Sequence, residues 1–109
     1  MLIQFIRPFI HYGLHFAFPL AIAYQLSKSK KQMWRYYFLQ ISTMIIDFDH
    51  FLASPVFDSS RCSIGFHPLH SEVAILVYAV LLIPRKTRIT GIGLVTHIFT
   101  DAIDCLFII

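Results

Sequence analysis

The hydrophobic positions of the chain fall into four long segments that short polar stretches separate. Each segment is long enough for a helix, and Pro55 and Pro84 follow the second and third, where a helix is expected to stop. Pro19 lies four residues after His15 and is expected to kink the first helix. With no internal repeat and no linker, the pattern predicts one all-α domain over residues 1–109. The predicted helices cover residues 5–26, 34–53, 69–83 and 89–109.

The composition predicts that this helical bundle is a membrane protein. Hydrophobic residues make up 57% of the chain and charged residues 14%, whereas a soluble domain carries about 25% charged residues. The net charge of +3 comes from basic stretches at 28–35 and 85–88 and is no signal for nucleic acid. Both stretches follow an odd-numbered helix, so the positive-inside rule makes their side cytoplasmic. We predict an integral membrane four-helix bundle, a single transmembrane domain with both termini outside. Its partner is membrane lipid, and a bundle this small can also form a homodimer.

The segment between the second and third helices is expected to be a partly re-entrant loop. From Ser71 to Ile83 a helix is only about 20 Å long at 1.5 Å per residue, against a hydrocarbon core of about 30 Å. The third helix should therefore begin below the outer surface. The loop carrying His67 and His70 should then dip into the protein, where surrounding protein or water can satisfy its irregular backbone.

Ionisable residues from all four helices are predicted to meet at one depth. Counting 1.5 Å per residue from the end of each helix next to a basic stretch places them roughly 13–24 Å from that end. They are His11, His15, Asp47, Asp49, His50, His70, His97, Asp101 and Asp104. Charged side chains at bilayer depth cost about 2.5–3.5 kcal/mol each and usually mark a functional site.

A divalent cation is the chemistry that best explains this set. Neighbouring carboxylates repel one another, and a cation neutralises them. A mixture of imidazole and carboxylate ligands suits Zn²⁺, with Mn²⁺ or Fe²⁺ as alternatives. Because the set exceeds one tetrahedral shell, either two ions bind or some residues support the ligands, and Asp49 and Glu72 are the candidate bases. The candidate metal ligands are His15, Asp47, Asp49, His50, His67, His70, His97 and Asp101.

Structural roles stay open beside this one. A single histidine such as His11 more often makes an interhelical hydrogen bond than it binds a ligand. For Asp104, near the outer interface, an interhelical hydrogen bond and a functional role are equally favoured. Asp58 and Glu72 fit ordinary loop charges, although Glu72 is near enough to act as a base. The whole cluster can also be read as a structural polar network.

The two cysteines and the N-terminal segment can each indicate the cellular compartment of the protein. Cys62 and Cys105 match no metal-ligand spacing. They can pair in an oxidising compartment, but free thiols are the favoured interpretation. Ala21-Ile22-Ala23 resembles a signal-peptidase site after an apolar run. Most of the positive charge follows that run, however, and the run contains two histidines, so we expect a retained helix.

Three ordered motifs carry a resemblance to a known family. They are Asp47-x-Asp49-His50, then His67…His70-Ser71, then His97-x-x-x-Asp101. This series resembles the metal-dependent hydrolase family of bacterial inner-membrane proteins, the YdjM-like group, which has an early histidine, D-x-D-H, H-R-G-x-T-H-S and H-x-x-x-D. The resemblance implies a metal-dependent hydrolase of the bacterial inner membrane with His15 as the early ligand. Here the third element lacks the Arg, Gly and Thr, and the form Gly65-Phe66-His67-Pro68-Leu69-His70-Ser71 suggests a small branch.

Three functions are compatible with these observations. The leading one is a metal-dependent hydrolase that acts on a lipid or envelope-type ester or phosphoester, because the site lies in the outer half of the bilayer. The second is a haem-binding electron-transfer bundle with His15 and His97 as axial ligands, although the nearby carboxylates suit harder cations. The third is a non-enzymatic protein whose cluster serves as a proton or ion pathway or a structural metal site.

Overall fold

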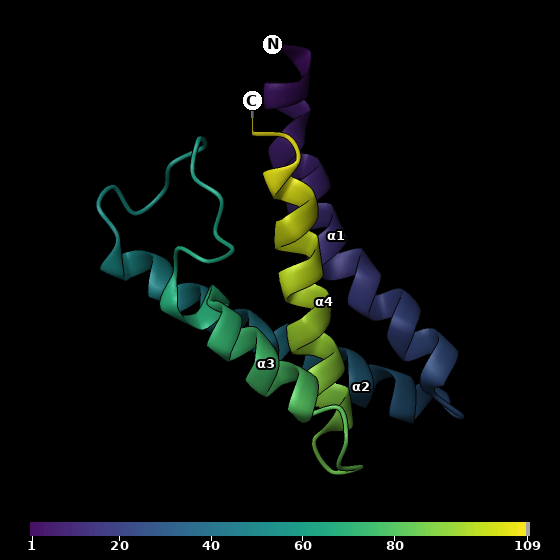
Figure 1. The fold of residues 1–109 in the computed structure, drawn as a ribbon. Helices are drawn as coiled ribbons and strands as arrows, with labels where there is room; N and C mark the ends of the chain where they lie inside the picture. The colour runs from purple at the N-terminus through teal and green to yellow at the C-terminus, as the bar shows by residue number, and fades with distance from the viewer. Residues whose placement is uncertain (109) are drawn as a thin grey trace.

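The computed structural model describes residues 1–108 and confirms the all-α prediction (Figure 1). α4 lies at the centre, in contact with α1, α2, α3 and the 3₁₀-helix η1. Both termini lie at the same end of the molecule in Figure 1, where the Gln4 side chain donates a hydrogen bond of 3.3 Å to the Phe107 carbonyl oxygen. In chain order the elements are α1 (Leu2–Leu26), α2 (Lys30–Ser42), η1 (Thr43–Leu52), the 3₁₀-helix η2 (Pro68–His70), α3 (Glu72–Val80) and α4 (Arg88–Cys105).

Local capping explains where the helix boundaries differ from the predicted ones. α2 begins before residue 34 because the Ser29 hydroxyl caps it, accepting a hydrogen bond of 3.1 Å from the backbone N–H of Gln32. Ser71 caps α3 in the same way, so residues 69–70 fall outside that helix. α4 ends at Cys105. Residue 109, the predicted end of the last helix, lies outside the described residues.

The second predicted helix changes its winding at Thr43. Over the ten residues of η1 the buried positions are Thr43, Ile46 and Asp49, which is the period of a helix with three residues per turn. A 3₁₀ stretch of this length is uncommon and often accompanies a functional site. The tighter winding turns the Asp49 side chain towards the interior, while Phe48 and Phe51 stay exposed.

The buried face of α1 carries two polar side chains beside two small apolar ones, whereas its exposed face is apolar. Arg7, His15, Pro19 and Ala23 are buried, at separations of four or eight residues that place them on one side. This arrangement reverses the pattern of a helix on a soluble domain. The exposed face carries Leu2, Phe5, Phe9, Tyr12, Phe16, Leu20 and Tyr24.

The same reversal holds for the molecule as a whole. Among the described residues, five hydrophobic side chains are buried against eleven polar or charged ones, and 26 large hydrophobic side chains are exposed. The interior is therefore a polar cluster flanked by a small apolar core of Ile46, Tyr78, Leu94 and Ile98. No helix in the described part of the chain combines the length and the apolarity that a membrane crossing needs. The predicted membrane location stays a prediction.

Two glycines allow α4 to lie close to its neighbours. A Cβ atom built on Gly93 would sit 2.8 Å from the Cα atom of Gln40 in α2. One built on Gly91 would sit 3.0 Å from the backbone of Leu81, just after α3. At both positions the missing side chain lets a neighbouring segment approach α4. The close approach brings the α4 side chains within reach of η1.

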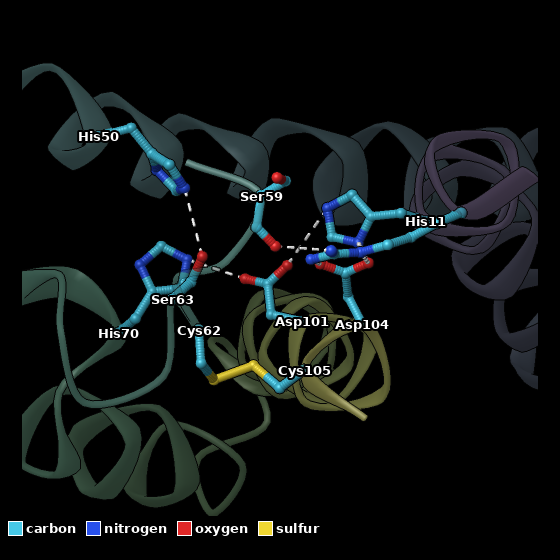
Figure 2. The surroundings of a disulfide bond; sticks show 10 residues. His11, His50, Ser59, Cys62, Ser63, His70, Asp101, Asp104 and Cys105 are labelled. Carbon is cyan, nitrogen blue, oxygen red and sulfur yellow. Dashed lines mark hydrogen bonds and ion pairs between the residues drawn. A yellow bond between two sulfur atoms is a disulfide. The ribbon is translucent and has the colours of Figure 1, made fainter. Parts of the chain in front are cut away.

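A disulfide fixes the loop between η1 and η2 to the end of α4. Cys62 and Cys105, 43 residues apart, are bonded (Figure 2), so the expectation of free thiols is wrong. The sequence did not reveal their proximity because it depends on how the loop folds back onto α4. The returning loop buries His67 and His70, as expected for a loop that dips into the protein.

Candidate metal centre

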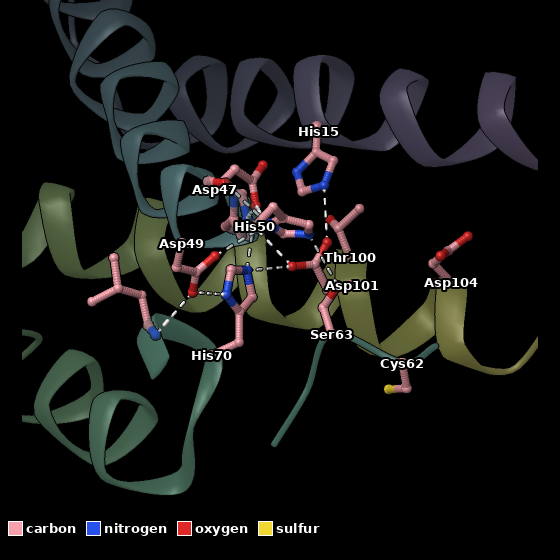
Figure 3. A network of polar contacts seen from close by, with 12 residues as sticks. His15, Asp47, Asp49, His50, Cys62, Ser63, His70, Thr100, Asp101 and Asp104 are labelled. Carbon is pink, nitrogen blue, oxygen red and sulfur yellow. Dashed lines mark hydrogen bonds and ion pairs between the residues drawn. The ribbon is translucent and has the colours of Figure 1, made fainter. Parts of the chain in front are cut away.

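Four elements bring the ionisable residues together around the middle of α4. α1 supplies His11 and His15, η1 supplies Asp47, Asp49 and His50, the end of the loop and η2 supply His67 and His70, and α4 supplies His97 and Asp101. Figure 3 shows several of these side chains converging from different helices. Their nitrogen and oxygen atoms form three groups that can hold a metal ion. The groups are Asp47–His70–His97–Asp101, His11–His15–Asp101 and Asp49–His50–His67.

The first group has the geometry of a coordination shell. Nε2 of His70 lies 2.9 Å from Oδ2 of Asp101 and 3.3 Å from Oδ1 of Asp47. Nε2 of His97 lies 3.1 Å from the same Asp47 oxygen and 3.3 Å from the same Asp101 oxygen. Metal–ligand bonds of 2.0–2.1 Å separate neighbouring ligand atoms by about 2.9 Å in an octahedron and about 3.3 Å in a tetrahedron. All four separations match these values.

Two of these atoms are buried without a hydrogen-bond partner in the described residues. They are Nε2 of His70 and Oδ2 of Asp101, which face each other at 2.9 Å. A buried polar atom that lacks a partner costs about 1–3 kcal/mol. A cation bound between Nε2 of His70 and Oδ2 of Asp101 would remove this cost for both atoms. The residues therefore fit a divalent cation with a mixed nitrogen and oxygen shell.

Asp49 fixes the orientation of His70 from behind the site. Its Oδ2 atom lies 2.9 Å from Nδ1 of His70 and accepts a hydrogen bond of 2.9 Å from the backbone N–H of Leu69. Because an ionised carboxylate only accepts, Nδ1 of His70 carries the proton and Nε2 is left to face the site. A carboxylate behind a ligand histidine is the usual support of a metal site. Asp49, predicted as a ligand and a base, thus supports the first group.

His50 shares the other oxygen of Asp49. Its Nδ1 atom lies 3.1 Å from Oδ1 of Asp49 and 3.0 Å from the backbone carbonyl oxygen of Asp47. Both are acceptors, so Nδ1 carries the proton and Nε2 is a free acceptor, 3.4 Å from the Ser63 hydroxyl oxygen (Figure 2). The His67 ring packs against the His50 ring at 4.0 Å between centroids. Burial and the neighbouring His50 lower the pKa of His67.

Without a cation, a positively charged His70 ring would balance the negative charge of the aspartates around it. Burial disfavours its charged form, but carboxylate oxygens of Asp49, Asp101 and Asp47 lie 2.9, 2.9 and 3.3 Å from its ring nitrogens and favour it. An imidazolium is therefore compatible with the same three carboxylates. A purely structural network is the alternative that any metal experiment has to exclude.

A cavity of about 510 Å³ gives access to the cluster. Five of the clustered residues line it, and they are His11, Asp47, His50, His67 and Asp101. Its apolar wall consists mainly of Tyr12, Met44, Phe48, Phe51, Val56 and Phe57. The buried side chains of His15, His70 and His97 lie behind this surface. The site thus has an accessible side and a closed side.

The structure brings the eight predicted ligands into the three groups. Glu72 is different, because it is exposed at the start of α3 and lies outside both the cavity lining and the groups. His11, for which a hydrogen-bonding role was expected, belongs to the second group in the structure. The spacing His11-x-x-x-His15 was the signal that could have identified it.

Asp104 makes the interhelical hydrogen bond that was one of its two expected roles, and its partner Arg7 was not predicted. Nε and Nη2 of Arg7 donate to the two carboxylate oxygens of Asp104, each over 2.8 Å, and Nη1 donates to the Ser59 carbonyl oxygen over 2.7 Å. The sequence pattern assigns no partner to this arginine. No local signal could have paired it with a residue 97 positions away.

Comparison with known proteins gives a family but no activity. No curated protein and no solved structure matches the chain. The resemblance to the YdjM-like hydrolases therefore stays a prediction. A family model does match, over residues 5–108. Because the match covers nearly the whole chain, the protein belongs to a family of unknown function, DUF6122.

Proposed function

We propose that this protein is a metal-dependent hydrolase whose ion is held by Asp47, His70, His97 and Asp101. The observation that carries the proposal is the convergence of two imidazole nitrogens and two carboxylate oxygens at 2.9–3.3 Å. Two of these atoms are buried and unpaired. A divalent cation bound there supplies Lewis acidity, which activates water and polarises a carbonyl or phosphoryl oxygen.

The access route supports catalysis over a purely structural role. Asp47 and Asp101 reach the cavity, and the Asp47 side chain is 35% exposed. A structural metal site is closed, whereas a catalytic one keeps an open position for water or substrate. The cavity is also large enough for a small substrate, since ligand pockets measure about 300–1,000 Å³.

His50 is the best-placed general base. With Nδ1 as the donor to Asp49, Nε2 is the acceptor nitrogen of the ring, and His50 lines the cavity together with Ser63. Its Nδ1–H is held by Asp49, which keeps the ring in the tautomer that accepts a proton at Nε2. In the proposed reaction a water oxygen attacks the ester carbon or phosphorus, and His50 takes the water proton. The bond from that carbon or phosphorus to the departing oxygen then breaks, and His50 returns the proton to the departing oxygen. Asp49 orients both His50 and His70, and we assign it a positioning role.

The polarity of the molecule supports a lipid environment. The 26 exposed large hydrophobic side chains and the polar interior reverse the distribution found in soluble domains. We infer that the exposed apolar surface contacts membrane lipid. The substrate would then be an amphiphilic ester or phosphoester, with its chain along the phenylalanine wall of the cavity and its ester at Asp47 and Asp101.

The disulfide supports an orientation. Disulfides persist in oxidising compartments, and Cys62–Cys105 lies near the end of α4 that is close to both termini (Figures 1 and 2). We infer that this end faces outside and that the basic stretches at 28–35 and 85–88 face the cytoplasm, as in a bacterial inner-membrane protein.

A hydrolysis assay on the purified full-length protein tests the proposal. The substrates are nitrophenyl carboxylic esters with short and long acyl chains and nitrophenyl phosphodiesters with short and long alkyl chains. Each is assayed with Zn²⁺ or Mn²⁺. We expect metal-dependent turnover that falls by at least about 100-fold in His50→Ala, the scale of general base catalysis, and disappears in Asp101→Ala. Glu72→Gln changes a carboxylate outside the cavity and should keep full activity. Equal activity in all variants would contradict the proposal.

A structural ion-pair network is the second candidate. It is favoured by the position of His70, whose ring nitrogens lie 2.9–3.3 Å from carboxylate oxygens of three aspartates. In that case the protein should be equally stable with and without chelator, and no metal should copurify with it. The thermal unfolding midpoint in the presence and absence of chelator separates the two candidates.

A further inference from the structure

We propose that His11, His15 and Asp101 bind a second divalent cation, so that Asp101 bridges two ions. The inference rests on the first ion of the proposed function. The two oxygens of the Asp101 carboxylate face different groups. Oδ2 faces His70 and His97 at 2.9 and 3.3 Å, while Oδ1 faces His15 at 3.1 Å and His11 at 3.6 Å. One carboxylate thus contributes a separate ligand atom to each group.

Hydrogen bonds between neutral imidazoles use only part of the bonding capacity of the second group. Nε2 of His15 lies 3.1 Å from Oδ1 of Asp101 and 3.2 Å from Nε2 of His11. If His15 donates its proton to Asp101, it has no lone pair left to accept from His11. If it accepts from His11 instead, its lone pair faces an ionised carboxylate. A cation between the three atoms uses both lone pairs and the carboxylate charge together.

Burial and support are those of a built site. The side chains of His15 and Asp101 are 2% and 5% exposed. Nδ1 of His11 is buried without a hydrogen-bond partner among the described residues, and Oδ1 of Asp104 lies 3.9 Å from it. Arg7 fixes that carboxylate through two hydrogen bonds. At 3.9 Å, Asp104 adds negative charge near His11 but does not hydrogen-bond to it, unlike Asp49 and His70.

The second site also faces the cavity. His11 is 22% exposed in its side chain, and both His11 and Asp101 line the cavity. Three protein ligands leave at least one position open for water or substrate. Two cations that share a carboxylate are a common arrangement for phosphoester hydrolysis, where they stabilise the attacking and leaving oxygens. Within the proposed substrate class, the second site favours phosphoesters over carboxylic esters.

Manganese loading of the full-length protein tests this inference. The purified protein is stripped with chelator, loaded with Mn²⁺ and desalted, and its metal content and electron paramagnetic resonance spectrum are recorded. We expect two equivalents and the spectrum of an exchange-coupled pair. His15→Ala should bind one equivalent with the spectrum of isolated Mn²⁺. His11→Gln, a change at a partly exposed position, repeats the test if His15→Ala fails to fold.

The outcomes separate this inference from the proposed function. One equivalent in the unchanged protein overturns the second site and leaves the first intact. No bound metal overturns both. Two equivalents that persist in both His11→Gln and His15→Ala place the second ion elsewhere, with the Asp49–His50–His67 group as the next candidate, and overturn the assignment made here.

Discussion

Asp49 and His70 form a buried pair in which a carboxylate oxygen lies 2.9 Å from Nδ1 of the imidazole. The same oxygen accepts the backbone N–H of Leu69, so the 3₁₀-helices η1 and η2 are tied together at this point. The opposite nitrogen of His70 points at Asp101 from 2.9 Å. Asp49, a residue of η1, therefore determines that Nε2 of His70 is the nitrogen that points into the site.

Removing this support should weaken metal binding without removing a ligand of the first group. We expect Asp49→Ala to lower the affinity for Zn²⁺ or Mn²⁺ by about 10–100-fold, the usual effect of losing a carboxylate behind a ligand histidine. Competition with a chelating dye measures the dissociation constant. Glu72→Ala is the control, because its carboxylate is exposed and outside the three groups. Equal affinities in the two variants would show that Asp49 does not orient His70.

The disulfide should stabilise both the fold and the site. Cys62–Cys105 closes a separation of 43 residues, and removing a disulfide typically costs about 2–4 kcal/mol of unfolding free energy. The double variant Cys62→Ser/Cys105→Ser should unfold at a lower temperature and bind metal more weakly, because the loop that leads to His67 and His70 loses its anchor. Reductant should reproduce both losses in the unchanged protein and have no effect on the double variant. Unfolding temperatures that are unaffected by reductant would contradict this role.

Two glycines provide a matched test of helix packing. Gly93→Ala places a Cβ atom 2.8 Å from the Cα atom of Gln40, and such overpacking typically costs about 1–3 kcal/mol. Gly13→Ala adds the same methyl group at an exposed position of α1 with no atom within 4 Å, where alanine favours a helix by up to about 1 kcal/mol. Chemical unfolding should therefore shift in opposite directions. A harmless Gly93→Ala would mean that α2 and α4 do not cross closely.

The Arg7–Asp104 pair should be strongly coupled. The two side chains are 10% and 20% exposed and share two hydrogen bonds of 2.8 Å. Removing one partner of a buried pair leaves an uncompensated charge and costs about 3–5 kcal/mol, whereas replacing both by apolar residues can be nearly neutral. We expect Arg7→Leu to be less stable than Arg7→Leu/Asp104→Leu in chemical unfolding. Additive effects of the single changes would contradict the coupling.

Local patterns were enough to predict the four helices and much of the cluster. His97 and Asp101 are four residues apart on one helix, so a shared face follows from helical geometry alone. The proline and basic stretches likewise placed the helix ends to within a few residues. These predictions succeeded because they depend on neighbouring residues.

Features that depend on distant contacts could not be predicted from these patterns. The change to three residues per turn at Thr43 turns Asp49 inward behind His70, and no local signal in η1 reveals it. The loop between η1 and η2 has no periodicity, so the pairing of Cys62 with Cys105 and the exclusion of Glu72 depend on its tertiary path.

Metal content tests the central claim most directly. The full-length protein is purified in detergent, and its metal is measured by elemental analysis beside Asp101→Ala and Glu72→Ala. Asp101 contributes to both proposed ion sites, so the account predicts at least one equivalent of zinc or manganese in the unchanged protein and in Glu72→Ala, and a loss in Asp101→Ala. No bound metal in any of the three, even after loading with Zn²⁺ or Mn²⁺, would contradict the metal centre and leave a structural ion-pair network.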